Sequence, residues 1–395
     1  MNRPIRVLHC PTTVAGNPQE LARAENSLGL ESTTVAFRED RFGYKADEFL
    51  FRGGEGYWAK ERKLWRLLWR AARSYDIVHF NFGMTFMPWY YAEEKYIGRR
   101  LPRFAYEALD AYKRLEDMCD LPILKMAGKG VVVTYQGDDA RQGDFCRANF
   151  EVSPVGEPGV DYYTPESDAD KRHRIARFDK YADKIYAVNP DLLHVLPPRA
   201  EFLPYANVDP SRWRPPGQPP AGRDGRLTVL HAPTHRGVKG TRYITEAVEL
   251  LRGRDGLDFD FVLVEGLPHA EVRRLYERAD LLVDQLLCGW YGGLAVELMA
   301  LGKPVVSYVR EGDLKFIPDA MRRDLPVINA TPATVYEVLK EWLTVRRGEL
   351  PAVGARSRAF VENWHDPLKV AARLKRDYEA ILASRRGRRR GGAPA

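Results

Sequence analysis

The 395-residue chain lacks a long hydrophobic run. A membrane-spanning helix needs about 20 predominantly apolar residues in succession, and no segment here reaches that length. The N-terminus (MNRPIRVLHCP) is a short basic lead into an apolar stretch, without the extended apolar region of a secretory signal peptide. We therefore expect a cytoplasmic protein, which at most lies against the inner face of the membrane.

Cysteine is scarce as well. The four cysteines lack the paired spacing of a disulfide framework or a zinc site, since they stand far apart at Cys10, Cys119, Cys146 and Cys288. The sequence thus predicts reduced thiols, no metal site and no bound cofactor.

Little excess charge remains outside the C-terminal tail. The formal net charge is +7, but the last residues (SRRGRRRGGAPA) hold five arginines, and 7 − 5 leaves +2 for the rest. With nothing apolar to bury, residues 385–395 are predicted to be a disordered basic tail. No base-stacking module accompanies them, so we expect no specific nucleic-acid partner. A weak peripheral contact with an anionic membrane surface fits such a tail better.

What the chain does contain is an alternation of short apolar runs with helical stretches. Asn17 and Pro18 follow the first run and are typical of a helix start. Runs of this length between helices are typical of buried parallel strands, so the fold class is α/β with a doubly wound sheet. In the first half of the chain they cover residues 5–9, 76–80, 131–135 and 183–188.

A stretch rich in proline and glycine interrupts the alternation, which begins again at residue 227. This pattern predicts two Rossmann-like domains, over residues 1–205 and 226–362, joined by a linker over residues 206–225. A last helix, predicted over residues 363–384, carries apolar residues at helical spacing. It would cross back to brace the first domain.

The segment His231–Thr241 (HAPTHRGVKGT) joins the first strand of the second domain to a helix that Thr241 can cap. The helix N-terminus offers free N–H groups, and Gly240 lets a ligand approach the backbone. Arg236 and Lys239 can neutralise phosphate oxygens. These features predict a diphosphate site, with a solvated loop carrying incidental charges as the alternative.

Glu297 lies further along, within a predicted helix of small and apolar residues (GGLAVELMALGKPVV). A buried carboxylate is costly without a partner. A ribose diol at the mouth of the sheet would supply one. A hydrogen bond from Glu297 to the backbone of a neighbouring loop is the alternative.

Together, HAPTHRGVKGT, LLVD and GGLAVELMALGKPVV resemble the donor domain of the family-four GT-B glycosyltransferases, which are retaining enzymes. The resemblance implies the GT-B fold, two Rossmann-like domains facing each other across a cleft. It also implies transfer of a sugar from a nucleoside-diphosphate sugar to an acceptor hydroxyl. In this family an Arg and a Lys, here Arg236 and Lys239, hold the donor diphosphate, and the acid matching Glu297 holds the ribose.

One family residue is missing. A second acid that contacts the donor sugar stands, in the family, where this chain has Gly289. Its contact is then lost or supplied by a neighbour such as Asp284 or Gln285. The donor-binding candidates of this domain are Thr234, Gly240, Thr241, Asp284, Gly292, Gly293 and Glu297.

In the first domain, the loop TTVAGNP before the first helix resembles the Gly-rich turn that the superfamily closes over the donor phosphates. Gly16 and Asn17 are the candidates. A plain helix cap is an equally good interpretation of the same residues.

The segment Gln136–Arg141 (QGDDAR) follows a predicted strand and places polar groups at the carboxyl edge of the sheet. Where the resembled family often has a His, this chain has Gln136, which cannot act as a base but can bind hydroxyl groups. That suffices if the leaving diphosphate itself takes the acceptor proton. Asp138 joins Gln136 as a candidate near the transferred sugar, whereas Asp139 and Arg141 are candidates for acceptor binding or for a turn and salt bridge.

His79 ends the preceding strand and is predicted to point into the same cleft. It would be the general base of an inverting enzyme, or else a structural residue.

The helix predicted over residues 58–75 is amphipathic and basic. One face carries Trp58, Trp65, Leu68, Trp69 and Ala72, and we expect it to pack against the sheet with the cations in water. Docking on a membrane is the alternative. Residues 149–170 form a long irregular stretch, predicted to be an acceptor-binding lid.

Two other functions stay open. A GT-B nucleotide-sugar epimerase would share the fold, and a non-catalytic nucleotide-sugar-binding protein would explain Gly289 and Gln136. The acceptor of a transferase would be a saccharide, a lipid-linked glycan or a small molecule.

Overall fold

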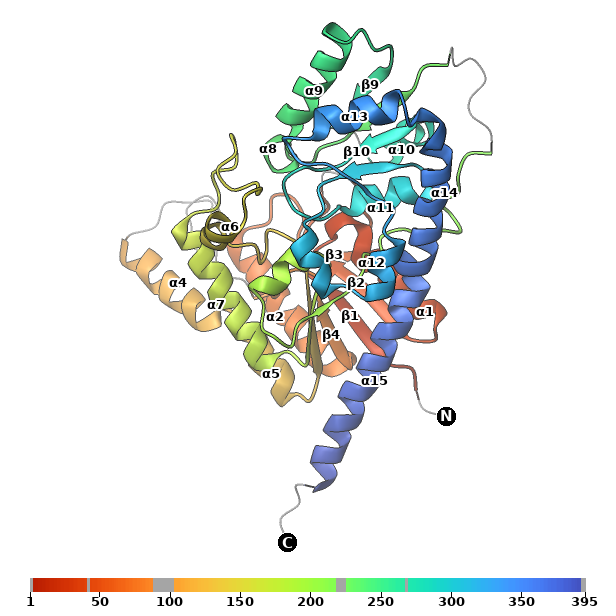
Figure 1. Ribbon diagram of the computed structural model, residues 1–395. Helices are drawn as coiled ribbons and strands as arrows, with labels where there is room; N and C mark the ends of the chain where they lie inside the picture. Colours follow the sequence, from red (N-terminus) through yellow and green to blue (C-terminus); the bar gives the residue numbers. More distant parts are fainter. Residues whose placement is uncertain (1–2, 41–42, 88–102, 218–224, 267–268, 392–395) are drawn as a thin grey trace.

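The computed structural model describes residues 3–40, 43–87, 103–217, 225–266 and 269–391. Two parallel sheets, each flanked by helices, form the two halves of the molecule (Figure 1). This arrangement confirms the predicted fold class, two Rossmann-like α/β domains of the GT-B type.

The first domain is built on a seven-stranded sheet in the order β3-β2-β1-β4-β5-β6-β7. Its central strands are buried on both faces because helices cover both sides of a parallel sheet. The strands are β1 (Arg6–Cys10), β2 (Glu31–Ala36), β3 (Glu48–Phe49), β4 (Ile77–Phe80), β5 (Gly130–Tyr135), β6 (Lys184–Ala187) and β7 (Glu201–Phe202). The longer helices are α1 (Asn17–Ser27), α2 (Tyr57–Ser74), α4 (Arg103–Glu116), α5 (Asp120–Met126), α6 (Gly143–Asn149) and α7 (Pro165–Tyr181).

The second domain has a five-stranded sheet in the order β12-β11-β10-β8-β9. Its strands are β8 (Thr228–His231), β9 (Asp260–Leu263), β10 (Leu281–Val283), β11 (Val305–Ser307) and β12 (Ile328–Asn329). Its helices are α8 (Arg236–Lys239), α9 (Thr241–Gly253), α10 (His269–Arg278), α11 (Gly293–Ala300), α12 (Asp319–Asp324), α13 (Val335–Leu343) and α14 (Leu350–Phe360).

Helix α15 (Pro367–Gly391) crosses back to the first domain, as predicted, and runs beside α1 (Figure 1). Leu374 and Tyr378 pack in one core with Val7 and Ile77. The expected disordered tail differs from the structure, because the helix continues past residue 385 to Gly391. Arginine is a good helix former, and Arg385 Nη2 lies 2.6 Å from Asp183 Oδ2, so the helix has an anchor at this point.

The amphipathic helix packs in the core of the first domain, as predicted, and Leu68 is buried there, but the predicted tryptophans do not belong to the packed face. In α2 the buried face is formed mainly by Leu64, Leu67 and Leu68, whereas the three tryptophans lie in solvent. The aliphatic residues recur at i, i+3 and i+4, which is the spacing of a face that packs on a sheet.

Candidate functional site

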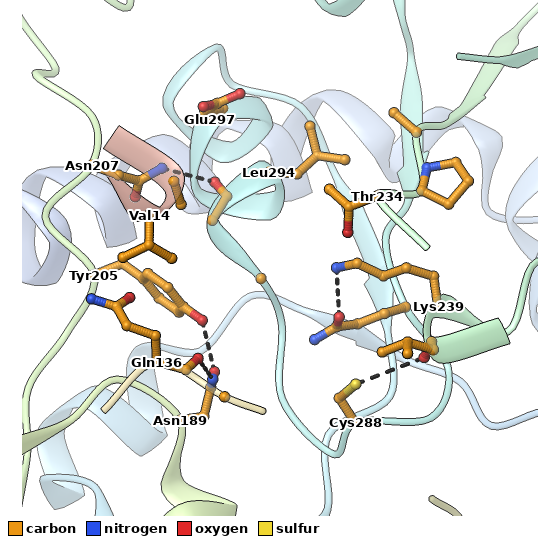
Figure 2. A pocket seen from close by; sticks show the side chains of 18 of the residues that line it. Val14, Gln136, Asn189, Tyr205, Asn207, Thr234, Lys239, Cys288, Leu294 and Glu297 are labelled. Carbon is orange, nitrogen blue, oxygen red and sulfur yellow. Dashed lines mark hydrogen bonds between the residues drawn. The ribbon is translucent and has the colours of Figure 1, made fainter. Parts of the chain in front are cut away.

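A cavity of about 450 Å³ lies between the two domains. That volume is within the range of roughly 300–1,000 Å³ found for small-molecule sites. Figure 2 shows Gln136, Asn189 and Tyr205 from the first domain on one side, and Thr234, Lys239 and Cys288 from the second domain on the other. The wall residues follow β5, β6, β8 and β10, so the cavity lies at the carboxyl edges of both sheets, where α/β ligand sites form.

Lys239, the last residue of α8, brings a cation to this cavity. Its Nζ lies 2.5 Å from Gln285 Oε1 and 3.2 Å from Asp284 Oδ1. Asp284 is buried behind the cavity wall, and its Oδ2 accepts a hydrogen bond of 2.7 Å from the Gly292 amide. Asp284 therefore orients Lys239 from behind the wall. Of the two side chains that bind Lys239, only Gln285 lines the cavity.

The N-terminus of α11 borders the cavity beside Lys239. Gly292 and Gly293 both line the wall. A Cβ on Gly292 would lie 3.0 Å from Lys239 Nζ, and one on Gly293 would lie 3.2 Å from Asn207 Nδ2. The two glycines let the helix end approach both groups, and the positive end of its dipole faces the cavity, as an anion site requires.

Glu297 follows one turn later in α11 and lines the end of the cavity shown at the top of Figure 2. Tyr44 of the first domain and Tyr276 of α10 also line it. Burial, and then the charge of Glu297, raise the pKa of both phenols, so both tyrosines stay protonated. Val264 and Val272 complete an apolar surface at the cavity wall, on which a flat ring can rest.

Gln136 presents two buried polar atoms to the cavity. Neither its Oε1 nor its Nε2 has a hydrogen-bond partner among the described residues. A buried amide without partners is costly unless a ligand or water supplies them. The structure thus places Gln136 in the cavity wall, and its contact with a substrate stays a prediction.

Asp138 and Arg141 also line the cavity and are bound to each other, with Arg141 Nη1 2.7 Å from Asp138 Oδ1. Arg141 Nε additionally donates to Asp191 at 2.9 Å, and Tyr162 and Tyr163 donate to Asp138. Although burial opposes it, Arg141 and the two tyrosines hold the pKa of Asp138 below its usual value. This carboxylate is thus an anion inside a hydrogen-bond network.

The loop between α6 and α7, predicted to be a lid, reaches across to the second domain. Glu157 accepts from Arg242 Nε at 3.0 Å and from the Tyr243 hydroxyl at 2.8 Å. Val160 packs in one cluster with Val238 next to Lys239. The loop therefore bridges the two domains beside the cavity.

Arg236 is not brought to the cavity. Its exposed guanidinium forms an ion pair with Glu265, with Nε 2.7 Å from Oε1 and Nη2 2.5 Å from Oε2. The cavity wall does not include it. The position predicted for this residue is wrong because a carboxylate across the loop binds it instead.

The orientation predicted for His79 is also wrong. Its ring is fully buried in the first domain, where Nδ1 lies 2.7 Å from the Tyr378 hydroxyl and Nε2 lies 2.7 Å from Thr134 Oγ1. Burial, and then the neighbouring His9, lower the pKa of His79. A ring with both nitrogens occupied inside the core cannot take a proton from a substrate in the cavity.

Asp139 makes a turn rather than a wall of the cavity. Its buried carboxylate accepts from the amides of Gln136, Gly137 and Gly83 at 2.7–3.1 Å. The acceptor contact predicted for Asp139 is therefore replaced by a structural role, because three backbone donors occupy its oxygens.

The helix start after β1 contributes to the cavity through other residues than predicted. Gly16 has a φ of +71° and leaves room for Tyr44, since a Cβ would lie 2.8 Å from its Cε1. Asn17 Oδ1 accepts from the Ala206 amide at 2.7 Å. Val14 and Ala15 are the residues of this turn that line the cavity.

Thr241 was predicted to cap α9, but it does not. The N-cap is Gly240, in the left-handed region with a φ of +74°, and the Thr241 hydroxyl lies 2.9 Å from His231 Nε2. Gly240 and Thr241 therefore shape the loop behind the wall, whereas Thr234 lines the cavity.

Several wall residues were not predicted from the sequence, and those with polar side chains include Tyr44, Asn189, Tyr205, Asn207 and Tyr276. Each lies in a loop or helix without a motif, so no local pattern marks them. The Asn-Pro step at residues 189–190, right after β6, was the nearest available signal.

No cluster of three or more metal-ligating side chains occurs within the described ranges. None of the helices in that part of the chain is both long and apolar enough to cross a bilayer.

Several solved structures share the fold over at least 95% of this chain. A sucrose-phosphate synthase from Thermosynechococcus elongatus is 14% identical over 97% of this chain and 100% of its own, with a TM-score of 0.58. The Anabaena protein HepE, solved in complex with UDP-glucose, is 11% identical over 95% of this chain and 100% of its own, also with a TM-score of 0.58. A glycosyltransferase from Rickettsia africae is 13% identical over 97% of this chain and 99% of its own, with a TM-score of 0.56. No protein-family model and no curated protein matches the sequence.

Proposed function

We propose that this protein is a glycosyltransferase that moves a sugar from a nucleoside-diphosphate sugar to an acceptor hydroxyl with retention of configuration. The observation that carries the proposal is one continuous cavity wall containing Lys239, the N-terminus of α11 and Glu297, with Gln136 on the opposite domain. A cation, a helix end and a buried acid in this order match a diphosphate followed by a ribose.

In this proposal the donor lies along α11. Glu297 accepts hydrogen bonds from the ribose diol, and the base rests on Val264 and Val272 beside Tyr276. Lys239 and the helix end hold the diphosphate. They stabilise the negative charge that develops on it as the bond to the sugar breaks, which is the largest charge change of the reaction.

Gln136 and Asp138 face the place where the sugar would lie. Gln136 can bind a sugar or acceptor hydroxyl through both of its unpaired atoms. The leaving diphosphate takes the acceptor proton on the same face, so no protein base is needed. Proton transfer to the diphosphate is consistent with the burial of His79 in the core, away from the cavity.

The side chain of Arg310 occupies the space next to Gly289, where the family has its second acid. A Cβ at this position would lie 2.5 Å from Arg310 Nη1. Arg310 is held there by Asp313 at 2.9 Å and by the Val152 carbonyl at 2.9 Å. We propose that Gln285, which lines the cavity beside Lys239, supplies the sugar contact instead.

The test combines binding and turnover. We expect a nucleoside-diphosphate sugar to raise the melting temperature, and sugar transfer to appear with one member of a panel of saccharide, lipid-linked and small-molecule acceptors. Transfer should persist in EDTA if Lys239 and α11 supply the positive charge. A new epimer formed without acceptor would establish an epimerase. Binding without turnover by any acceptor would favour a sensor, and absence of nucleotide binding would refute the proposal.

A further inference from the structure

Helix α2 exposes three tryptophans in a single stripe. Trp58, Trp65 and Trp69 are 63%, 41% and 63% exposed. They stand at i, i+7 and i+11, which places them on one face of the helix. Isolated apolar side chains on a protein surface are ordinary, but a contiguous patch of large ones marks an interaction site.

The orientation of α2 is fixed from the opposite side. Leu64, Leu67 and Leu68 are buried in the core of the first domain. Glu61 accepts a hydrogen bond of 2.6 Å from Lys113 Nζ of helix α4, and both side chains are buried. The tryptophans therefore cannot turn inward without breaking this packing.

Helix α4 also carries exposed apolar side chains. Phe104 and Leu115 are 73% and 84% exposed and share one face of α4, since they are eleven residues apart. The two helices are in contact, with Trp65 Nε1 3.2 Å from the Tyr112 hydroxyl. We call the exposed side chains of Trp58, Trp65, Trp69, Phe104 and Leu115 the aromatic face.

Cations accompany the aromatic face. Arg62, Arg66 and Arg73 are exposed on α2, and the Arg73 guanidinium lies 4.2 Å from the ring centre of Trp69. The one acid of α2, Glu61, is buried beneath. The water-facing side of α2 is thus purely cationic and aromatic.

A groove of about 550 Å³ has one of these arginines, Arg66, in its wall. It is lined by four cations and two acids, namely Arg52, Lys63, Arg66, Arg70, Glu48 and Glu55. Lys63 and Arg70 pair with the two acids, at 2.5 and 2.6 Å. The remaining positive charge can bind a phosphate group.

We infer that the aromatic face of α2 and α4 docks on an anionic lipid bilayer. Tryptophan is the side chain most suited to the boundary between acyl chains and headgroups, and arginine beside it binds lipid phosphates. An anionic surface attracts each nearby cation. The exposed charges of α2 are all positive, which matches an anionic lipid surface, while α4 contributes the exposed acid Glu107. This inference does not depend on the proposed enzymatic function.

The test is flotation of the full chain with vesicles of phosphatidylcholine alone or mixed with phosphatidylglycerol. We expect binding to the mixed vesicles, weakened by salt. The double substitution Trp58→Ser/Trp69→Ser should lower the partition coefficient about tenfold or more, and Arg62→Glu/Arg66→Glu should remove the preference for anionic vesicles. Val345→Ser is the matched control, because Val345 is 86% exposed in the other domain. It should leave binding unchanged.

Deletion of residues 386–395 separates this surface from the arginine tail. Retained binding by the deletion variant supports the aromatic face, whereas complete loss of binding on deletion overturns the inference. Absence of vesicle binding, or equal binding by Trp58→Ser/Trp69→Ser and the parent, also overturns it. So does a concentration-dependent dimer that the tryptophan substitutions abolish. An unchanged melting temperature of each variant shows that a loss of binding is not a loss of fold.

Discussion

Asp284 binds both Lys239 and the start of helix α11. One carboxylate oxygen lies 3.2 Å from Lys239 Nζ and the other lies 2.7 Å from the Gly292 amide nitrogen. Because Asp284 is buried, these contacts fix the cation and the helix end relative to each other. A diphosphate entering the cavity would meet a positive site arranged before binding, which is the condition for strong electrostatic stabilisation of a leaving group.

Substituting Lys239→Met removes this charge while keeping a similar side-chain length. We expect kcat to fall by about 10²–10³, the range typical of a lost group that stabilises transition-state charge. Initial-rate kinetics and donor binding by calorimetry measure the effect. Arg236→Met is the control, and it should change kcat little because Arg236 pairs with Glu265 outside the cavity. An equal loss of kcat in both variants would show that Arg236 also acts on the donor.

Gln136→Leu tests the unpaired amide in the cavity wall. The substitution keeps the approximate size of the side chain and removes its hydrogen bonds. We expect turnover to fall about tenfold, the equivalent of one hydrogen bond of about 1.4 kcal/mol, with donor affinity nearly unchanged. The melting temperature should stay equal or rise, because two unsatisfied buried atoms disappear. Full activity of this variant would exclude Gln136 from the reaction.

Gly289→Ala tests whether Arg310 excludes a side chain at the position of the missing acid. Gly289 has a φ of +75°, so an added Cβ is strained there by about 1–2 kcal/mol, and it would also press on Arg310. Gly54→Ala is the matched control, because Gly54 has a φ of +78° with no atom within 4 Å of a built Cβ. Chemical denaturation should show a larger loss for Gly289→Ala. Equal losses would mean that Arg310 moves aside freely.

Lys113→Met tests the buried ion cluster that joins α4 to α2. Lys113 Nζ lies 2.6 Å from Glu61 Oε2 and 2.5 Å from Glu116 Oε2. Removing it leaves two buried acids without their cation, which should cost about 3–5 kcal/mol of unfolding free energy. Lys45→Met, at an exposed pair with Glu39, should cost about 1 kcal/mol or less. A similar small loss for Lys113→Met would show that water reaches the cluster.

The same cluster predicts a pH dependence of stability. Burial, and then the hydrogen bond with Glu116, raise the pKa of Glu61 from 4.5 to about 7. The folded state therefore binds this proton more tightly than the unfolded state does, so the contribution of Glu61 is fully present below pH 4.5 and is lost as pH rises through about 7. Denaturation at a series of pH values should show a flatter profile in Glu61→Gln than in the parent. An identical profile in the two proteins would contradict the raised pKa.

Much of the fold could be read from local sequence. The runs that became β1, β4 and β5 are mostly apolar, and a parallel sheet buries such strands on both faces. The crossing helix was visible because its apolar residues recur at helical spacing over its first part. The location of Lys239 and Glu297 at the cavity also followed, since both come after strands whose carboxyl ends share one edge of the sheet.

The tertiary structure decided which partner each polar side chain takes. Arg236 lies in the same loop as Lys239, yet Glu265 from the end of the next strand binds it and holds it outside the cavity. Asp139 is adjacent to Asp138 but turns to backbone amides, and His79 turns into the core.

The sequence by itself thus determined that the chain forms two parallel sheets and at which edge of the sheets the cavity lies, because these depend on periodicity and on the direction of parallel strands. Only the tertiary structure decided that Tyr44 and Tyr276 close the end of the cavity at Glu297 and that α2 turns its tryptophans to the surface. Those outcomes depend on contacts between residues far apart in the chain. Each side chain has several possible partners, and the packing of the whole chain selects one of them, which a local sequence pattern cannot predict.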